Sequence, residues 1–307
     1  MNKKGYLEDS FNWLFAIVVG IFVLALAIFI ATKLTHTEQT TQDAKIGNEI
    51  NILLNPLETS FESGTTSSFT LPVDTRIYAK CHSDEPFGKQ IIQISQKSFD
   101  RWSMTNISVG FSNKYIFTEK YVEGKNFYLF AKPFESPFKV ADLIIMTSSL
   151  NSYCFESAPE DIKKELTLLN QKNIFTENCP ENSYDICFSG GSNCYAKVDM
   201  SSQFVQKNYT KMFFSEEALM YSAIFSSPEI YECQLNRLML RINQLALIYK
   251  DKASFISRVN CNSNLNQDLI SLINAANSFS DSQDIYIIES ISEEINNKND
   301  FSGCKLW

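Results

Sequence analysis

The longest uninterrupted apolar segment of the chain lies near its N-terminus, from Trp13 to Ala31, inside the uncharged stretch Ser10–Thr32. A helix needs about 20 apolar residues to cross a hydrocarbon core about 30 Å thick. A soluble helix of this length normally carries a polar stripe, which this segment lacks. The pattern therefore predicts a transmembrane helix over residues 10–32, preceded by a leader over residues 1–9.

A cleaved secretory signal is the alternative interpretation of this segment. Such signals have an apolar region of about 7–15 residues that ends in a small-x-small site. The only such triplet, residues 25–27, lies inside the apolar run, so we expect the segment to stay attached as an anchor. Lys3 and Lys4 precede it and only Lys33 follows closely, which places the N-terminus in the cytoplasm by the positive-inside rule.

Residues 33–64 combine a polar stretch with apolar residues at helical spacing, among them Ile46, Ile50 and Leu53. This pattern predicts that the membrane helix continues into a stalk. A loop rich in Ser, Thr and Gly follows, so the remaining residues, 65–307, are expected to form an extracytoplasmic head.

The first half of the head has the β-branched and aromatic segments typical of strands, separated by Asn, Gly, Pro and Ser. Residues 123–126 predict a hairpin turn between two of them. Gly190 and Gly191 predict a second hairpin, whose two-residue turn places Cys187 opposite Cys194. The predicted strands are 69–80, 89–95, 107–111, 114–117, 126–131, 141–147, 185–189 and 192–195.

The second half of the head is predicted to be mainly helical, after an isolated helix over residues 158–171. Ser226 to Glu229 combine a capping box with a proline near the first helical position, so a helix begins there and runs to about Arg258. Its apolar residues, spaced alternately by four and three, indicate the central core helix, with coiled-coil pairing as the alternative. A further helix covers 265–279, and 285–295 is a strand, a helix, or one followed by the other.

These patterns predict a mixed α+β or α/β head with a strand-rich first half and a helix-rich second half. All eight cysteines follow the apolar segment, and their even number indicates disulfides formed in an oxidising compartment. Zinc binding is the alternative, but the chain has no C-x-x-C pair, and no metal site is predicted. The cysteines are Cys81, Cys154, Cys179, Cys187, Cys194, Cys233, Cys261 and Cys304.

The hairpin at Gly190 predicts the pair Cys187–Cys194. Two further pairings are expected. One joins Cys81 to Cys154, and the other joins Cys304 to Cys233 or Cys261.

Composition narrows the function classes. The chain has 307 residues, is 44% hydrophobic and carries a net charge of −8, so a nucleic-acid partner, which needs a basic face, is not expected. Its two histidines, His36 and His82, leave little scope for histidine chemistry, and no motif predicts a cofactor. Paired carboxylates are the remaining catalytic hypothesis, with a solvated acidic surface as the alternative. The candidates are Asp84, Glu85, Glu160, Asp161, Glu216 and Glu217.

Two Asn-x-Ser/Thr sequons follow the apolar segment, at Asn106 and Asn208. They are candidate glycosylation sites on an exported domain.

The segment Lys3-Lys4-Gly5, followed by Tyr6 and a long apolar helix, resembles the class III signal of archaeal pilin-like proteins. The resemblance implies that a prepilin peptidase cuts between Gly5 and Tyr6, and that the helix then mediates anchoring or filament assembly. The whole chain is also similar to single-span archaeal envelope proteins of unknown function.

Together these features predict a membrane-anchored extracytoplasmic envelope protein with a structural, adhesive or pilin-like role. Its expected partners are the lipid bilayer and itself or other envelope or pilus proteins. One alternative is a membrane-anchored extracellular hydrolase that uses carboxylates. Another is an envelope sensor or assembly factor that binds a different protein.

Overall fold

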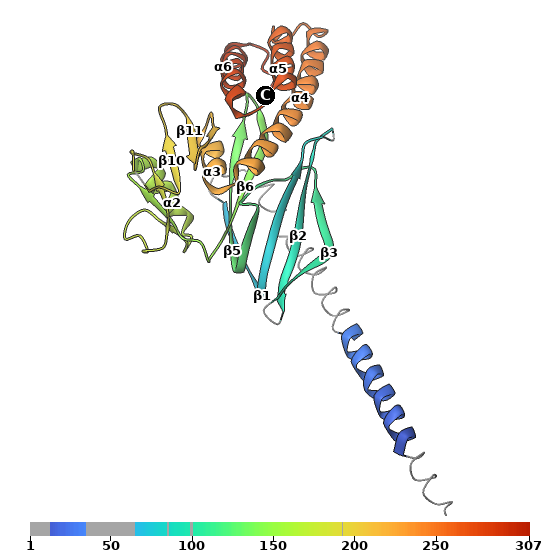
Figure 1. Cartoon of the computed structure of the whole chain (residues 1–307). Coiled ribbons are helices and arrows are strands. Elements are labelled where there is room, and N and C mark those ends of the chain that lie inside the picture. The colour runs from blue at the N-terminus through green and yellow to red at the C-terminus, as the bar shows by residue number, and fades with distance from the viewer. Residues whose placement is uncertain (1–12, 35–64, 85, 99–100, 192) are drawn as a thin grey trace, which may run out of the picture.

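A computed structural model describes residues 13–34, 65–84, 86–98, 101–191 and 193–307 (Figure 1). Within these ranges, one helix is long and apolar enough to cross a membrane, the 22-residue Trp13–Leu34, with a mean hydropathy of 3.2. All of its residues are exposed. The predicted leader, including Gly5 and Tyr6, and the predicted stalk beyond Leu34 lie outside the described residues, so the proposed division into segments stays a prediction.

The first sheet of the head has six strands in the order β3-β2-β1-β5-β6-β4. Neighbouring strands are antiparallel, except that β4 runs parallel to β6. All six contain segments that the sequence predicted as strands. Their bounds are β1 (Thr65–His82), β2 (Lys89–Ser98), β3 (Arg101–Phe111), β4 (Tyr115–Phe117), β5 (Tyr121–Glu135) and β6 (Lys139–Ser148).

The hairpin predicted at residues 123–126 is wrong, because β5 runs straight through them. Gly124 has a φ of +143°, and the register between β1 and β5 shifts at this point. A Cβ at Gly124 would lie 2.9 Å from the hydroxyl oxygen of Ser148. The glycine therefore marks a bulge inside one strand, where the backbone needs a conformation that other residues rarely adopt.

The second sheet has six shorter strands in the order β12-β11-β10-β9-β7-β8. Four of them, β8, β7, β9 and β10, are parallel, and β11 and β12 extend the sheet in antiparallel fashion. The helix α2 (Glu160–Leu169) connects β7 to β8, and Pro159 precedes its first residue. The bounds are β7 (Tyr153–Glu156), β8 (Ile174–Phe175), β9 (Tyr184–Cys187), β10 (Ala196–Asp199), β11 (Phe204–Lys207) and β12 (Thr210–Phe213).

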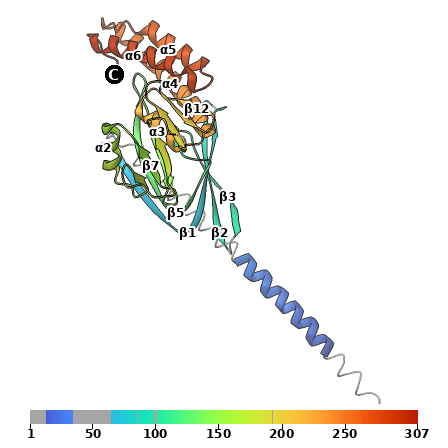
Figure 2. The ribbon, with the colours of Figure 1, turned by 60° about the vertical axis from the view of Figure 1, so that its left-hand side comes forward.

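The C-terminal part of the head is helical, as predicted, and consists of α3 (Glu217–Phe225), α4 (Pro228–Ser257), α5 (Asn266–Ser278), the 3-10 turn η1 (Ser282–Asp284) and α6 (Ile285–Phe301). The segment 285–295, left open by the sequence, lies in a helix. The prediction of α4 as a core helix is confirmed, because Tyr231, Leu235, Leu238 and Ile242 are fully buried. Two views show α5 and α6 beyond one end of the first sheet (Figure 1, Figure 2).

The short helix α3 packs between the two sheets and joins their cores. It contacts β5 and β6 of the first sheet and β11 and β12 of the second, and every residue from Ala218 to Phe225 is buried. The ring of Phe225 lies 5.6 Å from that of Phe130 in the first sheet and 4.8 Å from that of Tyr153 in the second. Burial on all sides explains why α3 has no polar face.

A buried arginine holds α4 on the first sheet. Arg237 is fully buried, and its guanidinium donates to the carbonyl oxygens of Lys114 at 2.9 Å, Ser112 at 3.0 Å and Phe111 at 3.2 Å. These carbonyls lie at the last residue of β3 and in the turn between β3 and β4. A charged group in the interior needs such partners, because its hydration is lost on burial.

The eight cysteines form four disulfides, Cys81–Cys233, Cys154–Cys179, Cys187–Cys194 and Cys261–Cys304. The predicted pair Cys187–Cys194 is confirmed, and of the two partners expected for Cys304, Cys233 and Cys261, it is Cys261 that forms the bond. The expected pair Cys81–Cys154 is wrong, because Cys81 lies in β1 beneath α4, whereas Cys154 lies in β7 of the other sheet.

The hairpin that motivated the pair Cys187–Cys194 is also wrong, since β9 and β10 are parallel. The loop that connects them brings the two Cα atoms to 5.9 Å. This separation is within the usual range for a disulfide. The pairing was therefore predicted correctly from a turn geometry that the chain does not adopt.

We expect the disulfide Cys81–Cys233 to stabilise the head most. It closes 152 residues of sequence, whereas Cys187–Cys194 closes seven. From the lost entropy of the unfolded chain alone, the expected stabilisation is about 5 kcal/mol for the long loop and about 2 kcal/mol for the short one. Urea unfolding of the double variants C81S/C233S and C187S/C194S measures both losses. Equal losses, or a larger loss for the short loop, would contradict this ranking.

Candidate functional site

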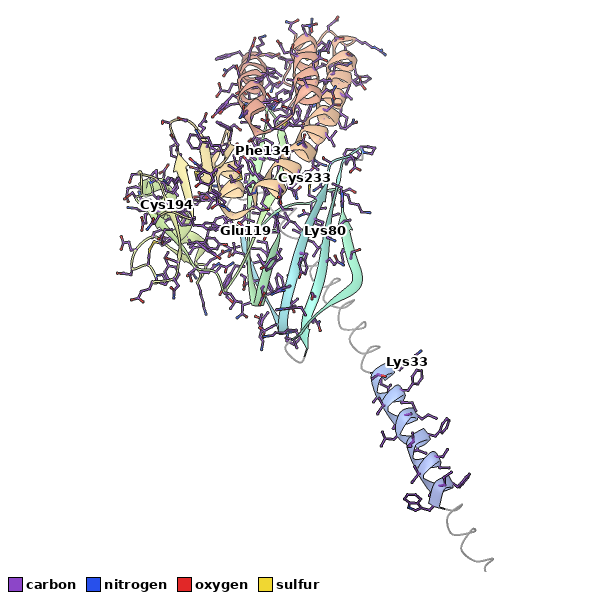
Figure 3. All side chains as sticks on the ribbon, in the orientation of Figure 1. Lys33, Lys80, Glu119, Phe134, Cys194 and Cys233 are labelled. Carbon is purple, nitrogen blue, oxygen red and sulfur yellow. A yellow bond between two sulfur atoms is a disulfide. The ribbon has the colours of Figure 1, made fainter. Side chains whose placement is uncertain are left out.

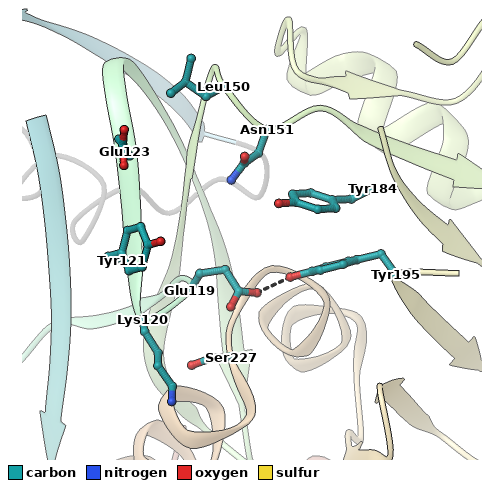
Figure 4. A pocket seen from close by; sticks show the side chains of 9 residues that line it. All are labelled: Glu119, Lys120, Tyr121, Glu123, Leu150, Asn151, Tyr184, Tyr195 and Ser227. Carbon is teal, nitrogen blue, oxygen red and sulfur yellow. Dashed lines mark hydrogen bonds between the residues drawn. The ribbon is translucent and has the colours of Figure 1, made fainter. Parts of the chain in front are cut away.

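The two sheets and the start of α4 meet around a groove with a volume of 440 Å³. Its walls come from the β4–β5 link and the start of β5, the turn after β6, the first residue of β9, the residue before β10, and the α3–α4 junction. Figure 4 shows their side chains arranged around one space. The lining residues are Glu119, Lys120, Tyr121, Glu123, Leu150, Asn151, Tyr184, Tyr195 and Ser227.

A buried lysine lies behind the groove. Lys207, the last residue of β11, is 5% exposed. Its ammonium donates to Glu119 Oε1 at 2.8 Å, to the Ser226 carbonyl oxygen at 2.8 Å and to the Tyr195 hydroxyl at 3.4 Å. Burial lowers the pKa of Lys207, and the nearby Glu119 opposes that effect. Because all three N–H donors have partners, Lys207 is a structural cation rather than an available nucleophile.

Two tyrosines form one wall of the groove. The rings of Tyr184 and Tyr195 are 4.3 Å apart between centroids and inclined by 31°. The Tyr195 hydroxyl donates to Glu119 Oε1 at 2.6 Å, and burial together with this carboxylate raises the pKa of Tyr195. The Tyr184 hydroxyl points into the groove (Figure 4). The disulfide Cys187–Cys194 follows Tyr184 and precedes Tyr195, so it holds the two tyrosines together.

The opposite wall belongs to β5 of the first sheet. Tyr121 is 48% exposed, and its ring is supported by the ring of Tyr78 at 5.7 Å and by the guanidinium of Arg76 at 5.2 Å. Arg76 also pairs with Glu123 at 2.6 Å between Nε and Oε2. The hydrogen-bonded Glu123 raises the pKa of Arg76. Figure 3 labels Glu119 between this sheet and the region of Cys194.

The floor of the groove is the N-terminus of α4, where the structure corrects one prediction. Pro228 begins the helix as expected, but no side chain caps it. The Ser226 hydroxyl donates to the Ser222 carbonyl oxygen at 2.5 Å instead. The Ser227 hydroxyl oxygen is buried and has no partner among the described residues. The predicted capping box is therefore wrong.

A smaller acidic pocket of 170 Å³ lies between α3 and α6 and contains Glu135, Glu216, Glu289 and Glu293. Burial, opposed mainly by a hydrogen bond from the Glu135 backbone, raises the pKa of Glu216 to about 8. Burial also raises the pKa of Glu289. Glu216 is thus mostly protonated at neutral pH, which allows proton donation but provides no carboxylate base.

The carboxylates predicted from sequence do not converge on one site. Glu160 and Asp161 begin α2, and Glu217 begins α3, where it contacts Lys132 at 3.3 Å. Asp84 follows β1, and Glu85 lies outside the described residues. Within the described ranges, the one group of metal-ligating residues in mutual reach is Cys154, Glu156 and Asp185. Its cysteine is bonded to Cys179 and offers no thiolate.

The remaining predicted sites are peripheral to the groove. Asn208 is exposed in the turn between β11 and β12, where a glycan could be attached, and Asn106 lies within β3. His82 is exposed at the end of β1, and His36 lies outside the described residues.

No family model, curated protein or solved structure matches this chain. The groove must therefore be interpreted from its own chemistry. It combines tyrosine rings, hydroxyl groups and an amide with charged groups that already have partners. These features fit non-covalent recognition of a small ligand better than nucleophilic catalysis.

Sequence analysis missed the residues that form this site. Lys207 follows an ordinary strand pattern, and nothing in the sequence shows that Glu119 faces it. A weak signal was present in Tyr184 and Tyr195, which flank the cysteine pair on both sides.

We predict that the ion pair of Lys207 and Glu119 is strongly coupled. The substitution Glu119→Gln leaves a buried ammonium without its carboxylate and should lower the free energy of unfolding by about 3 kcal/mol or more. Adding Lys207→Met to that variant should restore part of the loss. Urea unfolding of both single variants and the double variant gives the coupling energy. Strictly additive losses would show that the pair does not organise this part of the head.

Glu216 should make the head less stable as pH rises. Its folded-state pKa of about 8 lies above its ordinary value of 4.5, so the folded state retains a proton that the unfolded state has lost. Stability then falls between those pH values, by at most about 1.4 kcal/mol per pH unit. Thermal melts of Glu216→Gln should show less of this decline, whereas the exposed control Glu181→Gln should behave as wild type. An unchanged pH profile in Glu216→Gln would refute the assignment.

Proposed function

We propose that this protein is a single-pass membrane protein whose N-terminus lies in the cytoplasm and whose head binds a ligand outside the cell, in an adhesive or envelope-forming role. The single observation that carries the proposal is the helix Trp13–Leu34, which is uninterruptedly apolar from Trp13 to Ala31 and exposed along its whole length. A lipid bilayer is the environment in which such a surface is stable. The C-terminal head would then lie on the opposite side of the membrane from Lys3 and Lys4.

The four disulfides support an extracytoplasmic head. No cysteine in the described part of the chain is free. One bond joins β1 to α4, two close loops within the second sheet, and one ties the C-terminal segment to the residues that follow α4. Such bonds persist in oxidising compartments and are rare in reducing ones. Cleavage between Gly5 and Tyr6 and assembly with other pilin-like subunits are part of the same proposal.

The groove supports a recognition role for the head over the hydrolase alternative. Lys207, behind the groove, has no free N–H donor, and the acidic residues on the groove walls form ion pairs with Lys207 and Arg76. The protonated Glu216 belongs to a separate pocket. Binding through the groove needs none of these groups to change its protonation state.

The orientation can be tested by placing one reactive cysteine on each side of the membrane. Tyr209 is 97% exposed in the β11–β12 turn, so Tyr209→Cys should react with a membrane-impermeant maleimide on intact cells. The matched variant Glu8→Cys, which stays on the chain whether or not it is cut after Gly5, should react only after the cells are permeabilised. The wild-type protein, with its cysteines bonded, provides the unlabelled control. Labelling of Glu8→Cys on intact cells, with Tyr209→Cys protected, would overturn the proposed orientation.

A further inference from the structure

The Ser227 hydroxyl is the feature of the groove that most directly indicates a bound ligand. Ser227 is 5% exposed and occupies the N-cap position of α4. A serine there normally accepts a hydrogen bond from an N–H of the first helical turn. In this protein the hydroxyl oxygen has no partner among the described residues and lies on the groove side of its backbone (Figure 4). A buried hydroxyl is rarely left unpaired, so a bound group is its natural partner.

Two other neutral groups face the same space. The Tyr184 hydroxyl and the Asn151 amide both point into the groove (Figure 4). Tyr184 is 37% exposed, and its hydroxyl makes no hydrogen bond with the residues described. A hydroxyl can both donate and accept, and an amide offers donors and an acceptor. The groove is therefore suited to a ligand that has several hydroxyl groups.

The charges of the groove balance one another. Glu119 pairs with Lys207 at 2.8 Å, Lys120 with Glu229 at 2.6 Å and Glu123 with Arg76 at 2.6 Å. A charged ligand would have to break one of these pairs or stay uncompensated. This balance favours a neutral ligand over an anion or a cation.

The arrangement of the strands argues against an extended peptide as the ligand of the groove. A peptide that adds a strand needs an exposed sheet edge. The strands that contribute to the groove have neighbours on both sides, since β5 lies between β1 and β6, and β9 lies between β10 and β7. Tyr121 instead presents a half-exposed aromatic ring on one wall. A ring of this kind offers a flat apolar surface beside the polar groups.

We infer that the groove binds a neutral carbohydrate of one or two sugar rings. The Ser227 and Tyr184 hydroxyls and the Asn151 amide hydrogen-bond to sugar hydroxyls, and the Tyr121 ring packs against the apolar C–H face of a ring. The volume of 440 Å³ lies within the range of about 300–1,000 Å³ typical of small-ligand sites. This inference rests on the proposed function, because it names the ligand class of the exported head.

Isothermal titration calorimetry on the full-length oxidised protein tests the inference. The protein is kept in lipid nanodiscs or a sugar-free detergent, because glycoside detergents would compete for the groove. The probes are the neutral disaccharides maltose, cellobiose, lactose, chitobiose and mannobiose, with sialyllactose as the charged counterpart of lactose. We expect saturable binding of at least one neutral probe, and binding of sialyllactose at least about tenfold weaker than that of the best neutral probe.

Three variants locate the binding site. Ser227→Ala and Tyr184→Phe each remove one hydroxyl that has no protein partner, so the fold should be retained and affinity for the bound disaccharide should fall about 3–10-fold. Tyr209→Phe removes an exposed tyrosine hydroxyl elsewhere and should leave affinity unchanged. The inference is overturned if no neutral probe binds, if sialyllactose binds as well as the best neutral probe, or if both groove variants bind as wild type.

Because the calorimetry does not depend on membrane orientation, its failure leaves the proposed function intact. A head that faces outward but binds none of these sugars would refute the carbohydrate assignment alone. A head that faces inward would refute the proposed function, whatever the groove binds.

Discussion

A single buried ammonium, that of Lys207, joins the parts of the head that surround the groove. It belongs to β11 of the second sheet, and its partners are Glu119 after β4 of the first sheet, Tyr195 before β10 and the backbone of Ser226 before α4. These segments come from distant parts of the sequence. Because the ammonium is costly to bury without all of its acceptors, it fixes the distance between the two sheets at the groove.

Two other cations, those of Lys132 and Arg237, are also surrounded by oxygen acceptors and an aromatic ring where elements of the head meet. Lys132 of β5 pairs with Glu165 of α2, which also accepts a hydrogen bond from the Tyr221 hydroxyl at 3.1 Å. The charged groups of Lys132, Lys207 and Arg237 lie 5.3, 4.8 and 4.7 Å from the ring centroids of Tyr221, Tyr195 and Tyr115, respectively. Each cation thus has oxygen acceptors and an aromatic neighbour. What distinguishes Lys207 is that its cluster borders an open groove.

The sequence predicted most of the head's long elements because their patterns are local. The apolar spacing of α4, the proline at its start and the alternating residues of β1, β2 and β5 depend on neighbours within a few turns or positions. The short strands β7, β10, β11 and β12 were missed, since four residues provide too little periodicity. Gly124 and Gly190 were both interpreted as turns, but a glycine at a bulge or in a crossover loop has the same local appearance.

The groove was beyond sequence analysis for a physical reason. Each wall of the groove is built from an ordinary local feature, namely the start of a strand, a link between strands or the start of a helix. Only the packing of α3 between the two sheets brings these features together. The cysteines were the one long-range signal, and they correctly indicated a braced head. They did not reveal that Cys81 pairs with Cys233, because that contact depends on how α4 crosses the first sheet.

Hydrogen–deuterium exchange of the full-length protein, with and without the neutral disaccharide that it binds, tests the central claim most directly. If the groove that Lys207 holds together is the binding site, the sugar should slow exchange at residues 118–123, 149–151, 184–195 and 226–230, while exchange in α5 and α6 stays unchanged. Protection confined to α5, α6 or the acidic pocket near Glu216, with no change at the residues of the groove, would contradict the account.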